Sequence, residues 1–274
     1  MTNERLKKLQ KHALAARRTV ISMATGGGCF VGASLSCTDL FISLYFSEAN
    51  INPNNKKNPD RDYVLLSKGH AVPAWYAVLA EAGFFDRNLL KDYMKPGSHL
   101  YLHPNTHIPG IEFHAGSLGQ TLAVAAGIAY DQKVSDNTGR VFVILGDGEL
   151  NEGSIWETLL FIAAKKLNNL VIIIDRNELQ ANFTTEEVIP IEPIPDKFTA
   201  FGFSCLETDG HDFEKLEEAF ALARGSEKPA VIIAKTVRGK GIPGIERRAD
   251  KWFMQVTEHE RDQLIRELEQ QESR

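Results

Sequence analysis

Apolar residues follow two different patterns along this chain. From residue 4 to residue 24 they recur every three or four positions, which predicts an amphipathic helix. Elsewhere they form short continuous runs that are typical of strands buried on both faces. Strands are predicted at residues 63–66, 141–145, 170–174 and 230–234. Helices are predicted at residues 4–24, 38–46, 121–130, 154–166, 213–223 and 258–271, with a further one after residue 70.

The alternation of these strands and helices predicts the fold class. Strands that are apolar on both faces need helices on both sides, as in an α/β protein with a doubly wound, mostly parallel sheet. The chain has 274 residues, a length that one α/β domain can reach. No repeat, low-complexity segment or obvious linker interrupts the pattern, so residues 1–274 are expected to form a single domain.

Composition narrows the classes of function. Hydrophobic residues make up 43% of the chain and charged residues 24%, and the net charge of −5 provides no overall positive field for nucleic acid. The longest apolar runs are far shorter than the ~20 residues of a membrane span, and the polar start does not resemble a secretory signal. Cys29, Cys37 and Cys205 show no metal-ligand spacing. We therefore expect a reduced, cytoplasmic protein without disulfides, nucleic-acid partner or membrane partner.

The clearest candidate chemistry lies where the predicted strand 141–145 ends, at Gly146-Asp147-Gly148. The carboxyl ends of parallel strands form the ligand crevice of doubly wound sheets. Glycines there let a diphosphate approach the backbone, and the N-terminus of the following helix favours its negative charge. An Asp beside a diphosphate is repelled unless a divalent cation lies between them, and Mg²⁺ prefers such oxygen ligands. The alternative is a simple turn with a helix-capping Asp147.

The next predicted strand supports the metal interpretation. It ends in Asp175-Arg176-Asn177-Glu178-Leu179, one strand–helix–strand crossover after Asp147. Neighbouring strand ends lie side by side, so the side-chain oxygen of Asn177 and the backbone carbonyl of Leu179 are expected to reach the same ion. Asp147, Asn177 and Leu179 are therefore the predicted metal ligands.

These residues also resemble a known family. Gly146-Asp147-Gly148 with Asn177 resembles the thiamine-diphosphate signature, and its flanks are similar to the N-terminal part of transketolase. The resemblance spans roughly residues 12–252, with the motifs in the family's order. The further matching segments are Ser67-Lys68-Gly69-His70, Leu102-His103-Pro104 with Pro109-Gly110-Ile111-Glu112, Gly116-Ser117-Leu118-Gly119-Gln120, Asp209-Gly210-His211-Asp212 and Lys235-Thr236-Val237-Arg238-Gly239-Lys240-Gly241.

The resemblance implies thiamine diphosphate and Mg²⁺ as cofactors, with Ca²⁺ or Mn²⁺ able to replace Mg²⁺. It implies that His103 hydrogen-bonds the donor's terminal hydroxyl and the developing oxyanion, a task that suits imidazole near neutral pH. His103, His70 and Glu152 are its implied catalytic residues. The implied cofactor-binding residues are His70, Gly116, Ser117, Leu118, Gly146, Asp147, Gly148, Glu149 and Asn177. A structural role is open for each histidine.

The resemblance also implies a second polypeptide. In transketolases the glutamate that activates the cofactor belongs to a pyrimidine-binding domain that follows the diphosphate-binding domain. This chain stops at Arg274, so we expect that domain and its glutamate on a partner chain, in a heterotetramer. Glu152 matches the family position that contacts the partner's glutamate, and its alternative is an ordinary glutamate in the first turn of a helix. The apolar helices near 120–130 and 150–165 are candidate interface or core.

Two positions depart from the family. Cys29 lies in the glycine-rich turn where the family usually has a histidine, with one extra residue in the alignment, and Phe253 follows Trp252 where the family has a Trp-His pair. Losing two groups that hydrogen-bond donor or cofactor oxygens changes the expected specificity. We therefore hypothesise transfer of a two-carbon ketol unit from a ketose or ketose phosphate, with an unusual donor or acceptor. A modified sugar and a carrier-bound thiol are the candidates, and Cys29 is interpreted as a small space-filler.

Two other functions remain open from the sequence. The α subunit of a 2-oxo-acid dehydrogenase shares the Gly-Asp-Gly and Asn pattern, but it does not ordinarily carry the Ser67–His70 or Gly116–Gln120 segments. A non-catalytic homologue that binds the cofactor without turnover is the other, because both family histidines are missing. The transketolase interpretation is preferred over both because it accounts for the most segments.

Overall fold

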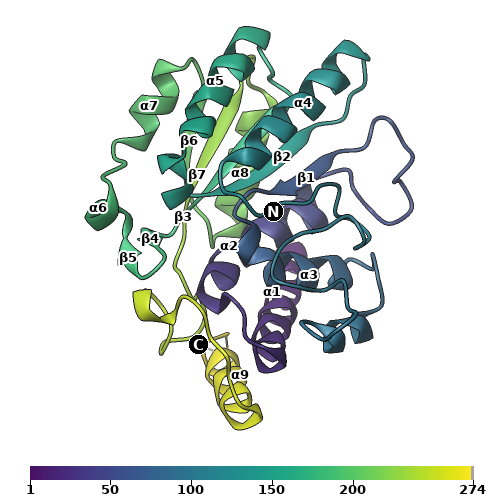
Figure 1. The fold of residues 1–274 in the computed structure, drawn as a ribbon. Helices are drawn as coiled ribbons and strands as arrows, with labels where there is room; N and C mark the ends of the chain where they lie inside the picture. Colours follow the sequence, from purple (N-terminus) through teal and green to yellow (C-terminus); the bar gives the residue numbers. More distant parts are fainter. Residues whose placement is uncertain (273–274) are drawn as a thin grey trace.

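The computed structural model describes residues 1–272, and its centre is a five-stranded parallel sheet (Figure 1). The strands lie in the order β1-β2-β3-β7-β6, and every neighbouring pair is parallel. Their bounds are β1 Tyr63–Leu66, β2 Val141–Gly146, β3 Leu170–Arg176, β6 Ser204–Asp209 and β7 Ala230–Lys235. A small antiparallel hairpin, β4 Leu179–Gln180 and β5 Phe183–Thr184, follows β3.

Helices cover both faces of this sheet. One face packs against α1 Asn3–Met23, α2 Val31–Ser43, α3 Val72–Glu81 and α8 Phe213–Arg224. The opposite face packs against α4 Gln120–Val134, α5 Gly153–Lys165 and α7 Ile194–Ala200. The short α6 Thr185–Val188 follows the hairpin, and α9 Glu258–Glu272 lies beside α1 (Figure 1). Within residues 1–272, no helix has the length and hydropathy needed to cross a bilayer.

The central strands show why the apolar runs predict this arrangement. Successive side chains of a strand point to opposite faces, so both sets must be apolar when both faces are covered. In β2, Phe142 and Ile144 are buried with the α1, α2, α3 and α8 side chains, whereas Val143 and Leu145 are buried with those of α4, α5 and α7. The predicted fold class, a doubly wound α/β protein, is confirmed.

Most predicted elements are present, with differences at the weakest signals. Helix α2 begins at Val31 and not at residue 38 as predicted, and all its residues are buried. Strand β6 was not predicted, because it is a half-exposed edge strand without a continuous apolar run. The hairpin and α7 were not predicted either, because these segments are too short to show a period.

Parallel strands place their carboxyl ends at one edge of the sheet, and the candidate residues follow those ends. Ser67–His70 follow β1, Asp147 follows β2, Asn177 follows β3, and Thr236–Arg238 follow β7. Gly146 pairs in register with Asp175, which brings the ends of β2 and β3 side by side. The fold therefore gathers segments that are far apart in sequence into one site.

Candidate active site

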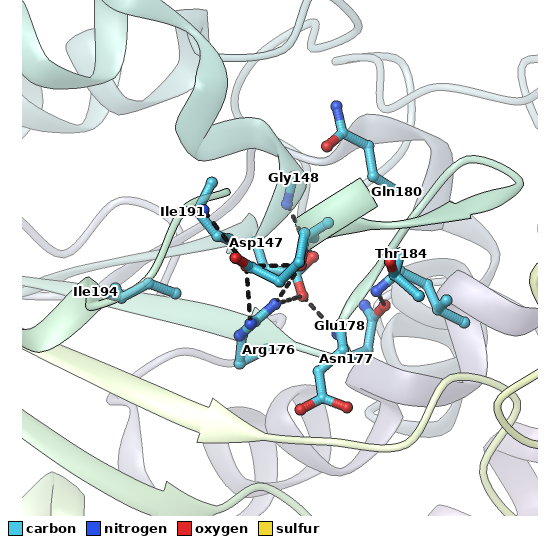
Figure 2. Close-up of polar contacts among 12 residues, drawn as sticks. Asp147, Gly148, Arg176, Asn177, Glu178, Gln180, Thr184, Ile191 and Ile194 are labelled. Atoms are coloured by element: carbon cyan, nitrogen blue, oxygen red, sulfur yellow. Dashed lines mark hydrogen bonds and ion pairs between the residues drawn. The ribbon is translucent and has the colours of Figure 1, made fainter. Parts of the chain in front are cut away.

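The carboxylate of Asp147 is held by the chain around it (Figure 2). Its Oδ1 accepts a hydrogen bond from the backbone N–H of Gly148 at 2.8 Å, and its Oδ2 accepts one from the backbone N–H of Glu178 at 2.6 Å. The guanidinium of Arg176 also donates to Oδ2, at 3.1 Å. Burial and the neighbouring Asp175 raise the pKa of Asp147 to about 6, although Arg176 acts in the opposite direction. A further cation beside this carboxylate would stabilise its charged form.

Arg176, which the sequence analysis did not single out, also contacts residues that follow the hairpin after β3. Its Nε donates to Glu192 at 3.1 Å, and its Nη1 donates to the hydroxyl of Thr185 at 2.8 Å. A second carboxylate, that of Glu186, lies 3.5 Å from Nη2. These other partners hold the Arg176 guanidinium in place beside Asp147. Its positive charge is therefore shared among several carboxylates and does not belong to Asp147 alone. Figure 2 shows Asp147 and Arg176 at the centre of these contacts.

Asn177 lies beside Asp147 at the end of β3, as the sequence predicted. Its Nδ2 donates to Asp175 Oδ2 at 3.0 Å, and its Oδ1 accepts from the backbone N–H of Leu179 at 3.1 Å. Across residues 1–272, no three His, Cys, Asp or Glu side chains come together in a group that fits a metal ion. The predicted ligands are one carboxylate, one amide oxygen and one backbone carbonyl, and the assignment of Asp147, Asn177 and the Leu179 carbonyl as metal ligands stays a prediction.

Asp175 is the most deeply buried charge of the site and organises four segments. Lys68 forms an ion pair with it, and the hydroxyls of Ser36 and Thr236 donate to it. Burial alone would raise its pKa, but the Lys68 ammonium and these hydrogen bonds hold the pKa of Asp175 below its usual value. Lys68 also donates to the backbone carbonyl of Ala33 at 2.9 Å. This pair therefore joins the loop after β1 to α2, β3 and the loop after β7.

We expect Lys68→Met to lower the free energy of unfolding by about 3–5 kcal/mol, because it leaves the buried carboxylate of Asp175 without its cation. Equilibrium urea unfolding of the cofactor-free chain measures this loss. The double variant Lys68→Met/Asp175→Asn is the control, since an amide keeps hydrogen bonds to Ser36 and Thr236 without a charge. Its loss should be about half that of the single variant. A single variant as stable as wild type would show that the pair does not support the fold.

Glu149 joins three segments in a similar way. Its Oε1 accepts from the Ser67 hydroxyl and from the backbone N–H of Gly119 at 2.7 Å, and its Oε2 accepts from the backbone N–H of Gly146 at 3.0 Å. Burial raises the pKa of Glu149. These contacts give Glu149 a positioning role, because they hold the loop at Gly119 against the ends of β1 and β2. A direct contact with a cofactor stays a prediction.

His70 and His103 lie near each other and near residues 116–120, the segment predicted to bind the cofactor, which we call the cofactor loop. A Cβ added to Gly69 would lie 3.1 Å from His103 Cδ2, and one added to Gly116 would lie 3.5 Å from the same atom. Burial lowers the pKa of both His70, to about 3, and His103, and Lys68, Arg238 and His103 lower that of His70 further. Both rings are therefore neutral at pH 7 in this environment. Gly116 and Ser117 are exposed and Leu118 is partly exposed, so this loop is open to a ligand.

Glu152 is exposed at the residue before α5, and not in the first helical turn. Its side chain lies against Gly119, where an added Cβ would be 2.8 Å from Glu152 Cβ. The carboxylate is thus placed at the surface beside the cofactor loop, in a position open to another chain. Its predicted role toward a partner's glutamate stays a prediction.

Arg238 is a second residue of the site to which sequence analysis gave no role. Its side chain is buried, with only 2% of the residue exposed, and its Nη1 donates to the Ala181 carbonyl at 2.7 Å. Its Nε and Nη2 have no hydrogen-bond partner among the residues that the structure describes. Burial lowers the pKa of Arg238 to about 10, while Asp147 and Asp175 act in the opposite direction. Buried donors without partners are costly, so this geometry fits an anionic ligand such as a diphosphate.

Two glycines of the site make room for neighbouring side chains. A Cβ at Gly148 would lie 2.8 Å from Gln180, and one at Gly32 would lie 3.0 Å from Arg238. Glycine at these positions therefore lets Gln180 approach the turn after β2 and lets Arg238 approach the start of α2. The Arg238 guanidinium is close enough to Asp147 to interact with its charge, so a diphosphate bound by Arg238 would lie near Asp147.

The structure confirms the space-filling interpretation of Cys29. Cys29 is completely buried, and burial raises the pKa of its thiol. It packs in the core with its thiol 3.8 Å from the Val20 carbonyl, as expected of a space-filler. The ring that lies beside His70 belongs to the next residue, Phe30, at a centroid distance of 5.4 Å. In this turn Cys29 therefore lies in the core, and Phe30 is the side chain that lies beside the site.

Comparison with known proteins assigns the family. Residues 11–269 match the family model described as transketolase, thiamine diphosphate binding domain. An apulose-4-phosphate transketolase subunit from Actinobacillus succinogenes is 38% identical over 95% of each chain. A 6-deoxy-6-sulfo-D-fructose transketolase subunit from a Clostridium species is 35% identical over 96% of this chain and 97% of its own.

A solved transketolase structure is also similar to this chain. The transketolase of Campylobacter jejuni superposes with a TM-score of 0.89 at 26% identity, over 100% of this chain and 43% of the other. The chain therefore spans less than half the length of that transketolase, but nearly the whole length of the two subunits. Both sets of relatives match along the segments that hold Asp147, Asn177 and Arg238. The chain belongs to the transketolase family of thiamine-diphosphate-dependent transferases, and it corresponds to the family's thiamine diphosphate binding domain.

Proposed function

We propose that this chain is the diphosphate-binding subunit of a split transketolase that transfers a two-carbon ketol unit from a ketose to an aldehyde acceptor. The observation that carries the proposal is the match, over nearly the full length of both proteins, to relatives that are named as transketolase subunits. The site supports it, because buried groups suited to a diphosphate and a divalent cation converge where the strands end.

The residues of this chain bind and orient the cofactor. Arg238 would hold the diphosphate, while Asp147, Asn177 and the Leu179 carbonyl would hold Mg²⁺ between that diphosphate and the protein. When bound, thiamine diphosphate supplies the carbanion sink for ketol transfer. His103 would donate a hydrogen bond to the donor's oxygen as charge develops there, a task that its lowered pKa suits because the ring stays neutral.

The pyrimidine domain and its glutamate are proposed to lie on a partner chain, in a heterotetramer with two copies of each chain. The outer surface of α4 and α5 fits such a contact. Tyr130, Val134, Leu160 and Phe161 are exposed there, with 62% of Leu160 accessible. Exposed apolar residues that cluster on two neighbouring helices are typical of a protein interface. Glu152 lies at the other end of this helix pair, at the start of α5 and against Gly119, which precedes α4.

The substrate is proposed to be a ketose or ketose phosphate outside the usual set. The names of the two relatives refer to apulose 4-phosphate and to 6-deoxy-6-sulfo-D-fructose, both unusual sugars. In this chain, Cys29 and Phe253 stand where the family usually has histidines that contact donor or cofactor oxygens, and the ring of Phe30 lies beside that of Phe253. These replacements support a substrate that differs from the common sugar phosphates.

Calorimetric titration of thiamine diphosphate tests the proposed function. We expect tight binding only when this chain is combined with its partner subunit, and only with Mg²⁺ present. Removal of the metal by a chelator should abolish the heat of binding, and Ca²⁺ or Mn²⁺ should restore it. A chain that binds no cofactor, alone or with its partner, would contradict the proposal, whereas turnover of pyruvate by oxidative decarboxylation would favour a 2-oxo-acid dehydrogenase.

A further inference from the structure

Three aromatic side chains gather beside the candidate site and form what we call the aromatic cluster: Phe30, Trp252 and Phe253. The ring centroid of Phe30 lies 5.0 Å from that of Trp252 and 5.2 Å from that of Phe253. The cluster adjoins His70, because Phe30 lies 5.4 Å and Trp252 lies 6.5 Å from its ring. It therefore lines the side of the site that His70 faces.

The cluster is held in place by the backbone. Cys29 and Met254 exchange two backbone hydrogen bonds, of 2.8 and 2.9 Å, which tie the segment after Trp252 to the glycine-rich turn. Gly28 has a φ of +86°, and a Cβ there would lie 2.6 Å from the Phe253 ring. Glycine is thus required for the turn to pass under Phe253. The backbone segments that carry Phe30 and Phe253 are therefore joined to each other, which keeps the rings of the cluster together.

This aromatic cluster is not part of the core. Phe253 is 42% exposed, and Phe30 and Trp252 are partly exposed, whereas Phe41 and Phe142 in the core are at most 1% exposed. The single polar atom of the three side chains is the indole Nε1 of Trp252. A hydroxyl group pressed against these rings would lose its water without gaining an acceptor, while a methyl or methylene group would gain from burial.

We propose that the aromatic cluster is an apolar wall of the substrate channel that selects substrates presenting a carbon without a hydroxyl group to it. This inference rests on the proposed function and names the class of its substrate. The cluster contacts His70, and His70 lies near His103, which is assigned to the donor's ketol oxygens. With the ketol oxygens at His103, the remainder of the carbon chain would lie against the cluster. The aldehyde that leaves the donor and the aldehyde that accepts the ketol unit occupy the same place in turn. The selection therefore applies to both.

Matched aldehydes test this selection in the enzyme reconstituted with its partner subunit. Hydroxypyruvate is the donor: its carboxylate leaves as CO₂, its two-carbon unit bonds to the aldehyde carbon, and the aldehyde oxygen takes up one proton. Propanal and glyceraldehyde have the same carbon chain but differ in two hydroxyl groups. We expect kcat/KM for propanal to exceed that for glyceraldehyde by about tenfold, the effect of one unpaired polar group.

Variants assign this preference to the aromatic cluster. Phe253→His places a hydrogen-bonding ring in the wall and should remove most of the tenfold preference, whereas Phe253→Leu keeps the wall apolar and should retain it. Phe30→His repeats the test at the second position. Leu222→His, at an exposed position of α8 outside the site, is the matched control and should behave as wild type. Thermal melting shows that each variant is folded.

Two outcomes overturn the inference without affecting the proposed function. They are a wild-type enzyme that prefers glyceraldehyde, and a Phe253→His variant whose preference equals that of wild type. A reconstituted enzyme that binds the cofactor but transfers the ketol unit to neither aldehyde, nor to any sugar, would instead overturn the proposed function and the inference with it.

Discussion

Asp147→Ala should lower the affinity for thiamine diphosphate in the presence of Mg²⁺ by at least about 100-fold. Changes to groups that merely orient a metal ligand cost about 10–100-fold in metal affinity, so loss of a ligand is expected to cost at least that much. The carboxylate of Asp147 is fixed by Gly148, Glu178 and Arg176 and has the charge that Mg²⁺ needs beside a diphosphate. Calorimetry with and without Mg²⁺ measures both the affinity and its metal dependence.

The fold should survive this substitution. Arg176, the cation that pairs with Asp147, keeps its contacts to Glu192, Glu186 and Thr185 when Asp147 is removed. The free energy of unfolding of the cofactor-free chain should therefore change by less than about 2 kcal/mol, below the usual cost of stranding a buried charge. Glu218→Ala, an exposed carboxylate on α8, is the control and should bind normally. Unchanged, Mg²⁺-dependent binding by Asp147→Ala would refute the metal assignment.

The central strands of the sheet were predictable because both faces of each strand lie in an apolar environment. Residues 141–145 and 170–174 are apolar at every position, as expected of strands that are covered on both faces. Strand β6 has the opposite character: it lies at the sheet edge, and its Glu207 and Asp209 are exposed. Without an apolar run there is no local signal, so its position depends on β7, the neighbour with which it pairs.

Helix α2 shows a second limit of local patterns. Its first turns contain Gly32, Ala33, Ser34 and Ser36, small residues that are all buried. A helix buried all round has no polar face, so it shows no period of 3.6. Small side chains here allow close packing against the other elements of the site, and this requirement is set by tertiary contacts. The start of α2 at Val31 was therefore not predictable from residues 31–37 alone.

In the candidate site, too, some residues were predictable from local sequence and others were not. Asp147 and Asn177 were predictable, because glycines and polar residues directly after apolar strands mark the carboxyl edge of the sheet. The role of Lys68 was not, because its partner Asp175 lies 107 residues away and the pair is visible only in the folded chain. Cys29 was correctly interpreted as a space-filler, but the position of Phe30 beside His70 was not predicted, because it depends on the backbone pairing of Cys29 with Met254. Sequence thus identified which segments meet, and the structure identified which side chains make the contacts there.

Arg238 is the clearest case of a side chain whose contacts only the folded structure shows, and it leads to the second large prediction. Arg238→Met should weaken thiamine diphosphate binding by about 100-fold, because two charge-assisted hydrogen bonds to the diphosphate are lost. Its effect on the cofactor-free chain should have the opposite sign. Nε and Nη2 are buried without partners in the described part of the chain, so replacing the guanidinium by an apolar side chain of similar length removes a desolvation cost.

We therefore expect Arg238→Met to raise the free energy of unfolding of the cofactor-free chain by about 1 kcal/mol while lowering the affinity for the cofactor. Chemical denaturation and calorimetry of the same preparation give the two values. Arg238→Lys keeps the charge and should lose less affinity than the methionine variant, whereas Arg266→Met, an exposed position on α9, should change neither value. A residue that only supports the fold would lose stability on substitution. If stability and affinity both fall in Arg238→Met, Arg238 is part of the scaffold, and the diphosphate must be held by other groups.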